Sequence, residues 1–288
     1  MKPARFTYEA PQTLEAALAS LAQHGDDAKV IAGGQSLAPM MNMRLAQPAR
    51  LIDIGRIARL DFVRAEADRL VIGALVRHAD VARHPQVRAL CPMLAHAAGT
   101  IGHYAIRQRG TIGGSLAHAD PAAQFPLVAI ALDAGIEVAS DAGHRTIPAT
   151  EFFLSIFSTA LKPDELVLAV SFPVSAEKYG WGFHHLARRA GDFAIAAVAA
   201  RTFRAPDGSV VKIDLAVGGI ASTPQKLGPE ILLAAGGRED TGWAERVAAA
   251  AADAARYEDN EQFSAEYRRD LVAALAHDAL QDACERSQ

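Results

Sequence analysis

The first third of the chain alternates between an amphipathic helical pattern and short apolar runs. Leucine and alanine recur at helical spacing from Leu14 to Leu21, Thr13 stands at the N-cap position before them, and Gly25 ends the pattern. Short apolar runs bounded by turn residues then predict buried strands. The expected strands are 29–32, 51–54 and 70–74, with helices around 78–84 and 93–98.

From Gly135 onward the pattern changes to strands, and near the C-terminus it changes again to helices. The predicted strands carry the sequences GIEVAS, ELVLAVSF, WGFHHLAR, AIAAVAARTF and VKIDLAVGGI, and alanine-rich helices are expected over 245–255 and 267–284. A change of pattern near residue 176 predicts two domains, 1–176 and 177–288. The second of these is expected to be an α+β module with an antiparallel sheet and helices.

Composition narrows the class of protein. The chain has 288 residues, of which 50% are hydrophobic and 22% are charged, as in ordinary folded domains. A net charge of −4 provides no positive field for a nucleic-acid backbone. No apolar run approaches the roughly 18 residues of a membrane span, and the N-terminus lacks an apolar leader. A cytoplasmic location is therefore expected.

Cysteine usage limits the redox chemistry that the chain performs by itself. Its two cysteines, Cys91 and Cys284, lie far apart and neither belongs to a CxxC pair. An iron–sulfur cluster takes four ligands, and a closed zinc site needs several histidines in addition. Any redox role therefore requires another cofactor, and we expect no metal site.

Two glycine loops repeat one composition. Residues 32–36 are A-G-G-Q-S, and residues 111–115 are T-I-G-G-S, preceded by Arg107 and Arg109. A single glycine pair after a strand is more often a tight turn than a ligand site. Two such loops, each with a hydroxyl group, suggest that backbone N–H groups bind a pyrophosphate from two sides. Neither loop matches the Rossmann or P-loop pattern, so a different dinucleotide fold is needed.

Three ordered segments carry a family resemblance. The stretches AGGQSLAPMMNMRLAQPARLIDI, IGHYAIRQRGTIGGSLAHADPAAQFPLVAIAL and ARRAGDFAIAAVAA resemble the FAD-binding medium subunit of the molybdenum hydroxylases, the xanthine dehydrogenase and carbon monoxide dehydrogenase type. The resemblance extends over essentially the whole chain, including a YRRDLVAAL helix like that of the carbon monoxide dehydrogenase flavoprotein C-terminal domain. It implies a vanillyl-alcohol-oxidase-type (PCMH-like) FAD-binding domain of two α+β subdomains, followed by a C-terminal α+β domain.

The resemblance also implies which residues contact FAD. The backbone of the first loop would hold the pyrophosphate region, the second loop would approach it, and a third group would lie beside the flavin, where the Phe193 ring shields one face. Gln124 stands where relatives carry an acid that bonds the sugar or adenine side, and Ser115 stands where some carry asparagine. The implied contacts are Ala32, Gly33, Gly34, Gln35, Ser36 and Leu37; Thr111, Gly113, Gly114 and Ser115; Ile101, Asp192 and Phe193; and Gln124.

Several other polar residues have simpler interpretations. His118 and Asp120 suggest an acid–base pair, but H-A-D before a proline also starts a helix, with Asp120 near its N-cap, and we favour the cap. His184 and His185 on a strand point to opposite faces, which disfavours a shared metal. By resemblance His184 aligns with a lysine that lies near the cofactor in some relatives. Met40, Met41 and Met43 are expected to pack the first loop against the core.

The implied function is electron transfer. FAD exchanges one or two electrons, so it connects one-electron clusters to a two-electron acceptor, and the chain needs no catalytic base or nucleophile of its own. The expected partners are a large molybdopterin subunit and a small subunit with two [2Fe-2S] clusters, and the acceptor is NAD, oxygen or a quinone. Two alternatives remain open: a self-sufficient FAD-dependent dehydrogenase or oxidase of the same fold, and a cofactor-free assembly module.

Overall fold

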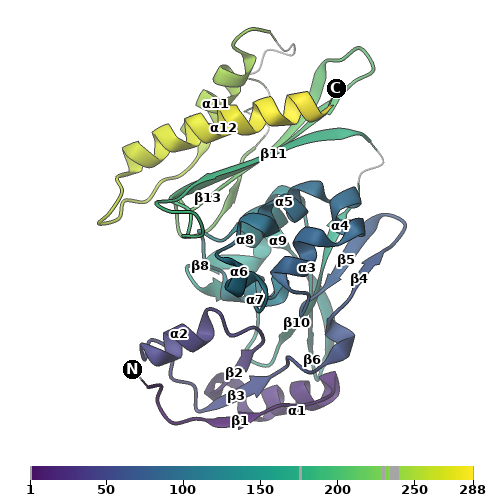
Figure 1. The fold of residues 1–288 in the computed structure, drawn as a ribbon, viewed down its shortest axis with the longest axis vertical. Helices are drawn as coiled ribbons and strands as arrows, with labels where there is room; N and C mark the ends of the chain where they lie inside the picture. Colours follow the sequence, from purple (N-terminus) through teal and green to yellow (C-terminus); the bar gives the residue numbers. More distant parts are fainter. Residues whose placement is uncertain (1, 175–176, 229–230, 232, 234–239, 288) are drawn as a thin grey trace.

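The computed structural model describes residues 2–174, 177–228, 231, 233 and 240–287. Its larger sheets follow one another along the long axis, with the N-terminal elements at one end and the C-terminal helices at the other (Figure 1). The predicted domain boundary at 176 falls on residues 175–176, which lie outside the described residues.

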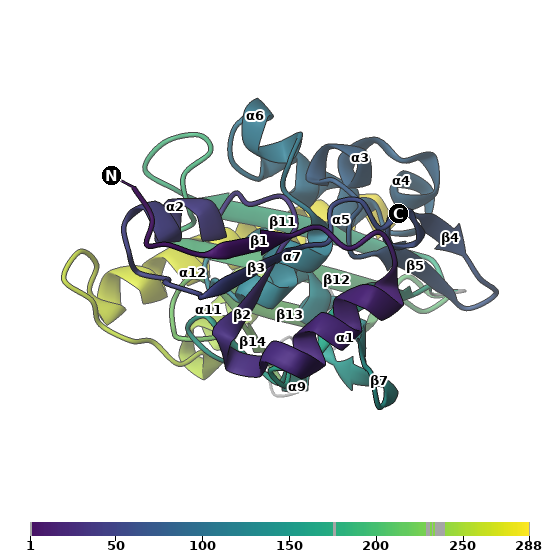
Figure 2. The same ribbon diagram turned by 90° about the horizontal axis from the view of Figure 1, so that it is seen from below.

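The first sheet is small and parallel, and it carries the first glycine loop at its edge. Its strand order is β1 (Thr7–Glu9), β3 (Arg50–Asp53) and β2 (Ala28–Ile31). Helix α1 (Leu14–His24) packs its leucines on this sheet, and Figure 2 shows α1 and β1–β3 from below. The Thr13 hydroxyl accepts the N–H of Ala16 at 3.2 Å, and Gly25 closes the helix with φ 49°, which confirms both predicted caps.

The second sheet is antiparallel and carries the helices that surround the second loop. Its order is β4 (Val63–Ala65), β5 (Arg69–Gly73), β10 (Leu166–Pro173), β6 (Gly135–Ser140) and β7 (Gly143–Pro148). Between β5 and β10 the chain forms α3 (His78–Arg83), α4 (Pro85–Leu90), α5 (Pro92–Thr100), α6 (Tyr104–Arg107), α7 (Ile112–His118), α8 (Gln124–Ala131) and α9 (Ala149–Phe152). Helix α2 (Leu37–Asn42) instead follows the first glycine loop and lies beside the first sheet (Figure 1). A hairpin of β8 (Phe153–Ser155) and β9 (Ser158–Thr159) follows α9. These two sheets with their helices confirm the predicted pair of α+β subdomains.

The third sheet is antiparallel, and both of its faces are covered. Its order is β11 (Tyr179–Leu186), β12 (Ala196–Arg204), β13 (Val210–Gly218) and β14 (Gln225–Lys226). Along β12, Ala197 and Ala199 join the core of the second sheet and its helices, whereas Val198 and Ala200 join a core with α11 (Trp243–Ala254) and α12 (Ala265–Ser287). The continuous apolar run predicted there is thus a central strand buried on both faces.

Helix α12 lies against β11 at backbone distance. A Cβ atom on Gly180 would stand 1.6 Å from the Ala283 carbonyl oxygen, and one on Gly182 would stand 1.9 Å from that of Ala279. Figure 1 shows α12 running along the outer side of this strand. The two glycines therefore allow α12 to pack directly against the backbone of β11.

Charged residues also join the third sheet to the end of α8. The Nη2 atom of buried Arg201 lies 2.7 Å from Asp214 and 3.6 Å from Asp133, and Lys226 binds the same Asp133 carboxylate. Asp133 follows α8, whereas the other three residues come from β12, β13 and β14. Among the described residues, no helix combines the length and apolar character that a membrane span requires.

Candidate functional site

The two glycine loops lie against each other. The first follows β2 and leads into α2, and the second enters α7 with Thr111 as its N-cap. A Cβ atom on Gly33 would stand 2.1 Å from the carbonyl oxygen of Arg109 and 3.0 Å from the Cα of Gly110. Loops that are distant in sequence thus meet backbone to backbone, and only glycine permits this approach.

A corner formed by Arg77 and His78 holds the second loop in place. The Arg77 guanidinium donates to the Arg109 carbonyl, and the backbone N–H of His78 donates to the Gly110 carbonyl at 3.0 Å. The His78 ring lies under Gly110, with its Nε2 3.1 Å from the Thr111 carbonyl oxygen. Arg77 therefore holds in place the Arg109 carbonyl, against which Gly33 packs.

The two loops differ in the donors that they offer. Within the part of the chain that the structure describes, no acceptor takes the backbone N–H groups of residues 33–37. The Gln35 side chain instead donates to the Gly33 carbonyl at 3.0 Å and keeps the loop curved. In the second loop, the N–H groups of Gly113 and Gly114 are already bonded, to the Ala74 carbonyl and the Thr111 hydroxyl. The free N–H donors therefore come from the first loop.

In the second loop, the predicted residues face different ways. Thr111 and Gly113 are buried, and a Cβ on Gly113 would stand 2.5 Å from that of Ala74. Gly114 is exposed and Ser115 is half-buried on the first turn of α7. This loop offers a close-fitting backbone surface and the Ser115 hydroxyl.

The residues expected beside the flavin form a second contact. Gly191 has φ 89°, and a Cβ on it would stand 2.6 Å from the His103 ring and 3.1 Å from the Gly102 carbonyl carbon. Arg107 donates to the carbonyls of Ile101 and Gly102 at 2.9 and 2.8 Å. The structure thus brings the Asp192–Phe193 pair to the Ile101 segment, and α6 connects that segment to the second loop.

The interpretation of Asp120 as a helix cap is wrong in detail. Helix α7 ends at His118, and α8 begins at Gln124 with Ala123 at the N-cap. The Asp120 carboxylate instead accepts the N–H of Ala122 at 2.9 Å in the intervening turn. The His118 ring stacks on Phe157 with centroids 4.8 Å apart, and burial lowers the pKa of His118 and raises that of Asp120. Gln124 is buried at the start of α8.

The histidine pair on β11 points to opposite faces, as predicted. His184 lies 3.1 Å from Asp282 of α12, whereas His185 lies on the same face as Phe183, which packs against α5. His184 is therefore turned toward α12, not toward α5. Within the described residues, no group of three or more His, Cys, Asp or Glu side chains is arranged for a metal ion.

The methionines after the first loop and the two cysteines can also be compared with the expectations. Met41 packs into the interior as expected, but Met43 is 49% exposed, because α2 ends at Asn42 and the chain turns outward there. Both cysteines are buried and unbridged, and burial raises the pKa of the Cys91 thiol to about 12, so it stays protonated.

The buried His78 gives stability a pH dependence that can be measured. Desolvation lowers its pKa from 6.5 to about 4, so between these values the unfolded chain binds a proton that the folded chain does not. The free energy of unfolding should therefore fall as pH falls from 6.5 toward 4, by about 3 kcal/mol in all.

Urea unfolding of the wild type and of His78→Gln across this range tests the expectation. The glutamine amide can still donate to the Thr111 carbonyl but does not titrate, so the variant should show a flatter pH dependence. Half-buried histidines elsewhere contribute equally to both proteins. Parallel pH profiles for the two proteins would contradict the assignment.

The arrangement fits a dinucleotide. Five consecutive N–H groups have no acceptor among the residues that the structure describes, which is the donor set that a pyrophosphate needs, and the glycine backbones leave room for it. The comparisons with known proteins agree. Residues 4–175 match the family model described as "FAD binding domain in molybdopterin dehydrogenase", and residues 181–283 match "CO dehydrogenase flavoprotein C-terminal domain".

Two of the similar proteins are named as medium subunits or chains. The nicotine 6-hydroxylase medium subunit of Paenarthrobacter nicotinovorans is 37% identical over 100% of both chains. The carbon monoxide dehydrogenase medium chain of Hydrogenophaga pseudoflava is 41% identical over 77% of each. A solved structure of carbon monoxide dehydrogenase from that organism superposes with a TM-score of 0.93 at 37% identity, covering 100% of both chains. The chain therefore belongs to the FAD-binding medium-subunit family of the molybdenum hydroxylases, and its cofactor is FAD.

Sequence reasoning missed the residues that support the loops. His78 begins a helix after a strand, a place where histidine is normally solvated, and only the fold shows that its ring lies under Gly110. Arg77 belongs to no sequence motif that would have indicated its role. A signal existed in Arg109-Gly110 immediately before Thr111, since glycine there indicates a close approach.

Proposed function

We propose that this chain is the FAD-carrying electron-transfer subunit of a heterotrimeric molybdenum hydroxylase. It would receive electrons from the [2Fe-2S] clusters of a small subunit, while a large molybdopterin subunit oxidises the substrate, and it would pass them to an external acceptor. When bound, FAD supplies the exchange between one-electron and two-electron transfer. The observation that carries the proposal is the first loop, residues 33–37: its N–H groups have no acceptor among the described residues, and its Gly33 packs against the Arg109 carbonyl of the second loop.

The chain's own residues would bind and position the cofactor. Backbone N–H groups from Gly33 to Leu37 would hold the pyrophosphate, with the Ala32 backbone beside them. The second-loop residues Thr111, Gly113, Gly114 and Ser115 would form the opposite wall, with the Ser115 hydroxyl as a further donor. Ile101, Asp192 and the exposed Phe193 ring would lie beside the flavin, and Gln124 would lie on the sugar side.

The absorption spectrum of the purified chain, alone and after co-expression with its neighbouring subunits, tests the proposal. We expect flavin bands at about one FAD per chain in both preparations, since one pyrophosphate cradle binds one dinucleotide. Iron–sulfur absorbance should appear in the co-purified complex alone, because two buried cysteines cannot ligate a cluster.

The alternatives correspond to other results of the same experiment. An isolated chain that oxidises an organic substrate with FAD alone would identify a self-sufficient dehydrogenase or oxidase. A colourless chain in both preparations would identify a cofactor-free assembly module. The domain division at residue 176 and the cytoplasmic location stay predictions.

A further inference from the structure

Arg107 stands just before the second glycine loop in the sequence, but its side chain binds a different segment. Its Nη1 donates to the carbonyl oxygens of Ile101 and Gly102 at 2.9 and 2.8 Å. Among the described residues, neither of these carbonyls accepts a backbone N–H group. The two carbonyls therefore depend on the guanidinium of Arg107 for their hydrogen bonds.

These carbonyls belong to a turn that the backbone does not close. Ile101 has φ −68° and ψ 121°, and Gly102 follows with φ 49°, which resembles the two central positions of a type II turn. Within the described part of the chain, no backbone hydrogen bond joins His103 to Thr100 across the turn. The Arg107 side chain thus supplies the bonds that hold the turn in shape.

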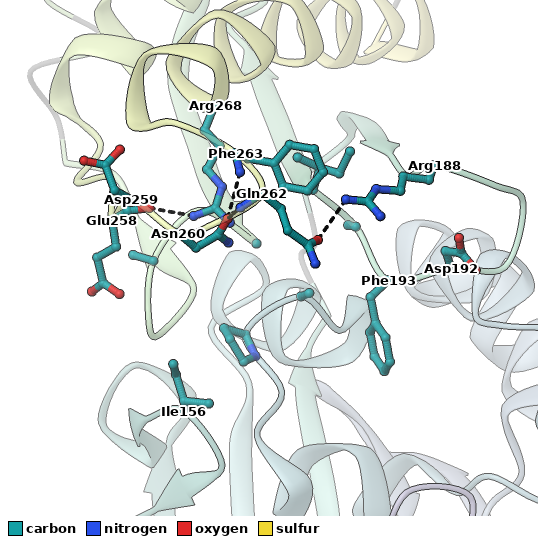
Figure 3. Close-up of a pocket in the computed structure, with 16 residues that line it drawn as sticks. Ile156, Arg188, Asp192, Phe193, Glu258, Asp259, Asn260, Gln262, Phe263 and Arg268 are labelled. Carbon is teal, nitrogen blue, oxygen red and sulfur yellow. Dashed lines mark hydrogen bonds between the residues drawn. The ribbon is translucent and has the colours of Figure 1, made fainter.

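The same turn seats the loop that carries Asp192 and Phe193. A Cβ on Gly191 would stand 2.7 Å from Nδ1 of the His103 ring and 3.1 Å from the Gly102 carbonyl carbon. Figure 3 shows Asp192 and Phe193 next to each other, beside a cavity that both line. The position of the turn therefore decides the position of both segments that the proposed function puts beside the flavin.

The second glycine loop is held by other groups. Its Arg109 carbonyl accepts from the Arg77 guanidinium, and its Gly110 carbonyl accepts the N–H of His78 at 3.0 Å. The Gly110 N–H donates to the Ile106 carbonyl at 2.7 Å, which fixes α6 to the loop. None of these bonds uses the donor that holds the turn on the flavin side.

We propose that two arginines position the two ends of FAD separately: Arg107 positions the flavin end, and Arg77 positions the pyrophosphate end. This inference rests on the proposed function, which puts FAD along these segments. Both arginines act through carbonyl groups of the chain, so they are positioning residues and not ligands of the cofactor. Loss of either arginine should disturb one end of FAD and leave the other in place.

Calorimetric titration of the apoprotein with ADP and with FAD measures the pyrophosphate end. ADP carries the pyrophosphate but no flavin, so it reports on that end alone. Arg77→Gln should raise both dissociation constants about tenfold, as the loss of one hydrogen bond from a charged group does. Arg107→Gln should leave the dissociation constant of ADP within about twofold of the wild type, because the two sites share no partner.

Visible circular dichroism at saturating FAD measures the flavin end. A bound flavin owes most of its visible dichroism to a fixed orientation in asymmetric surroundings. Arg107→Gln leaves two carbonyls without a donor and frees the turn, so the flavin band should lose amplitude. Arg77→Gln, once saturated with FAD, should give the band of the wild type.

Two further variants separate position from charge and from stability. A single nitrogen of Arg107 makes both bonds, so the ammonium group of Arg107→Lys can replace it and should recover most of the flavin band. Arg204→Gln is the control for stability, because Arg204 also donates to a turn carbonyl, that of Gly208 at 2.7 Å, but in the third sheet. It should lower the urea midpoint and change neither ADP binding nor the flavin band.

The inference would be overturned if Arg107→Gln weakens ADP as much as Arg77→Gln does, because Arg107 would then bind the phosphates itself. An unchanged flavin band in Arg107→Gln, or a lysine variant no closer to the wild type than the glutamine variant, would also overturn it. If Arg107→Gln does not fold, an altered flavin band in saturated Arg77→Gln still contradicts the division. A wild-type chain that binds no FAD refutes the proposed function itself, before any variant is made.

Discussion

Alanine in place of Gly33 is expected to leave the purified chain without its FAD. The new methyl group would lie 2.1 Å from the Arg109 carbonyl oxygen, which Arg77 holds from behind. One loop must therefore move away, and the N–H groups of the first loop lose their common orientation. We expect at least about a hundredfold weaker FAD binding, because several charge-assisted hydrogen bonds are lost together, and about 1–3 kcal/mol lower stability from overpacking.

The flavin absorbance per chain and a calorimetric titration of the apoprotein with FAD measure this effect. Gly99→Ala is the matched control, since Gly99 lies in α5 and a Cβ on it meets no atom within 4 Å. Helix propensity predicts that this control stabilises the chain by up to about 1 kcal/mol and keeps FAD. Full FAD occupancy in Gly33→Ala would show that the loops do not meet as described.

The second large effect is expected at Gly182, on the opposite side of the molecule. A Cβ there would stand 1.9 Å from the Ala279 carbonyl oxygen, so α12 must lift from β11. The helix covers the outer core with Val272, Ala276 and Leu280, and a rigid helix cannot move at one point alone. We expect Gly182→Ala to cost more than about 3 kcal/mol, or to give insoluble protein.

Soluble yield and urea unfolding measure this cost. Gly135→Ala is the strand control, because its new Cβ would meet only side-chain atoms, Thr146 Cγ2 at 2.9 Å and Ser171 Oγ at 3.0 Å. Turning Ser171 away breaks its hydrogen bond to the Gly135 carbonyl, so we expect a loss of about 1–2 kcal/mol, still below that of Gly182→Ala. Equal losses of stability in the two variants would mean that the close approach of α12 is not the reason why residue 182 must be glycine.

The elements whose signals are local could be predicted from the sequence. The helix between Thr13 and Gly25 carries its own caps, and the strand at 196–204 begins with a run of small apolar residues. The opposite faces of His184 and His185 follow from the period of a strand. Which histidine faces α12 does not follow, because that depends on where a distant helix packs.

The site was predictable in its parts but not in its assembly. Two glycine loops indicated a phosphate site, yet the Gly33–Arg109 contact joins the loop after β2 to the turn between α6 and α7, and no local pattern encodes such a pairing. Asp120 is of a residue type that favours the N-cap position, but in the folded protein α8 begins only at Gln124.

The contact between Gly33 and Arg109 has a consequence for biosynthesis. Neither loop reaches its binding shape before the other is in place, so the segments around β2 and α7 must both fold before the cofactor can bind. FAD then stabilises only the completed domain, in proportion to the logarithm of its free concentration. The riboflavin supply of the cell would thus set how much of this chain is protected from proteolysis.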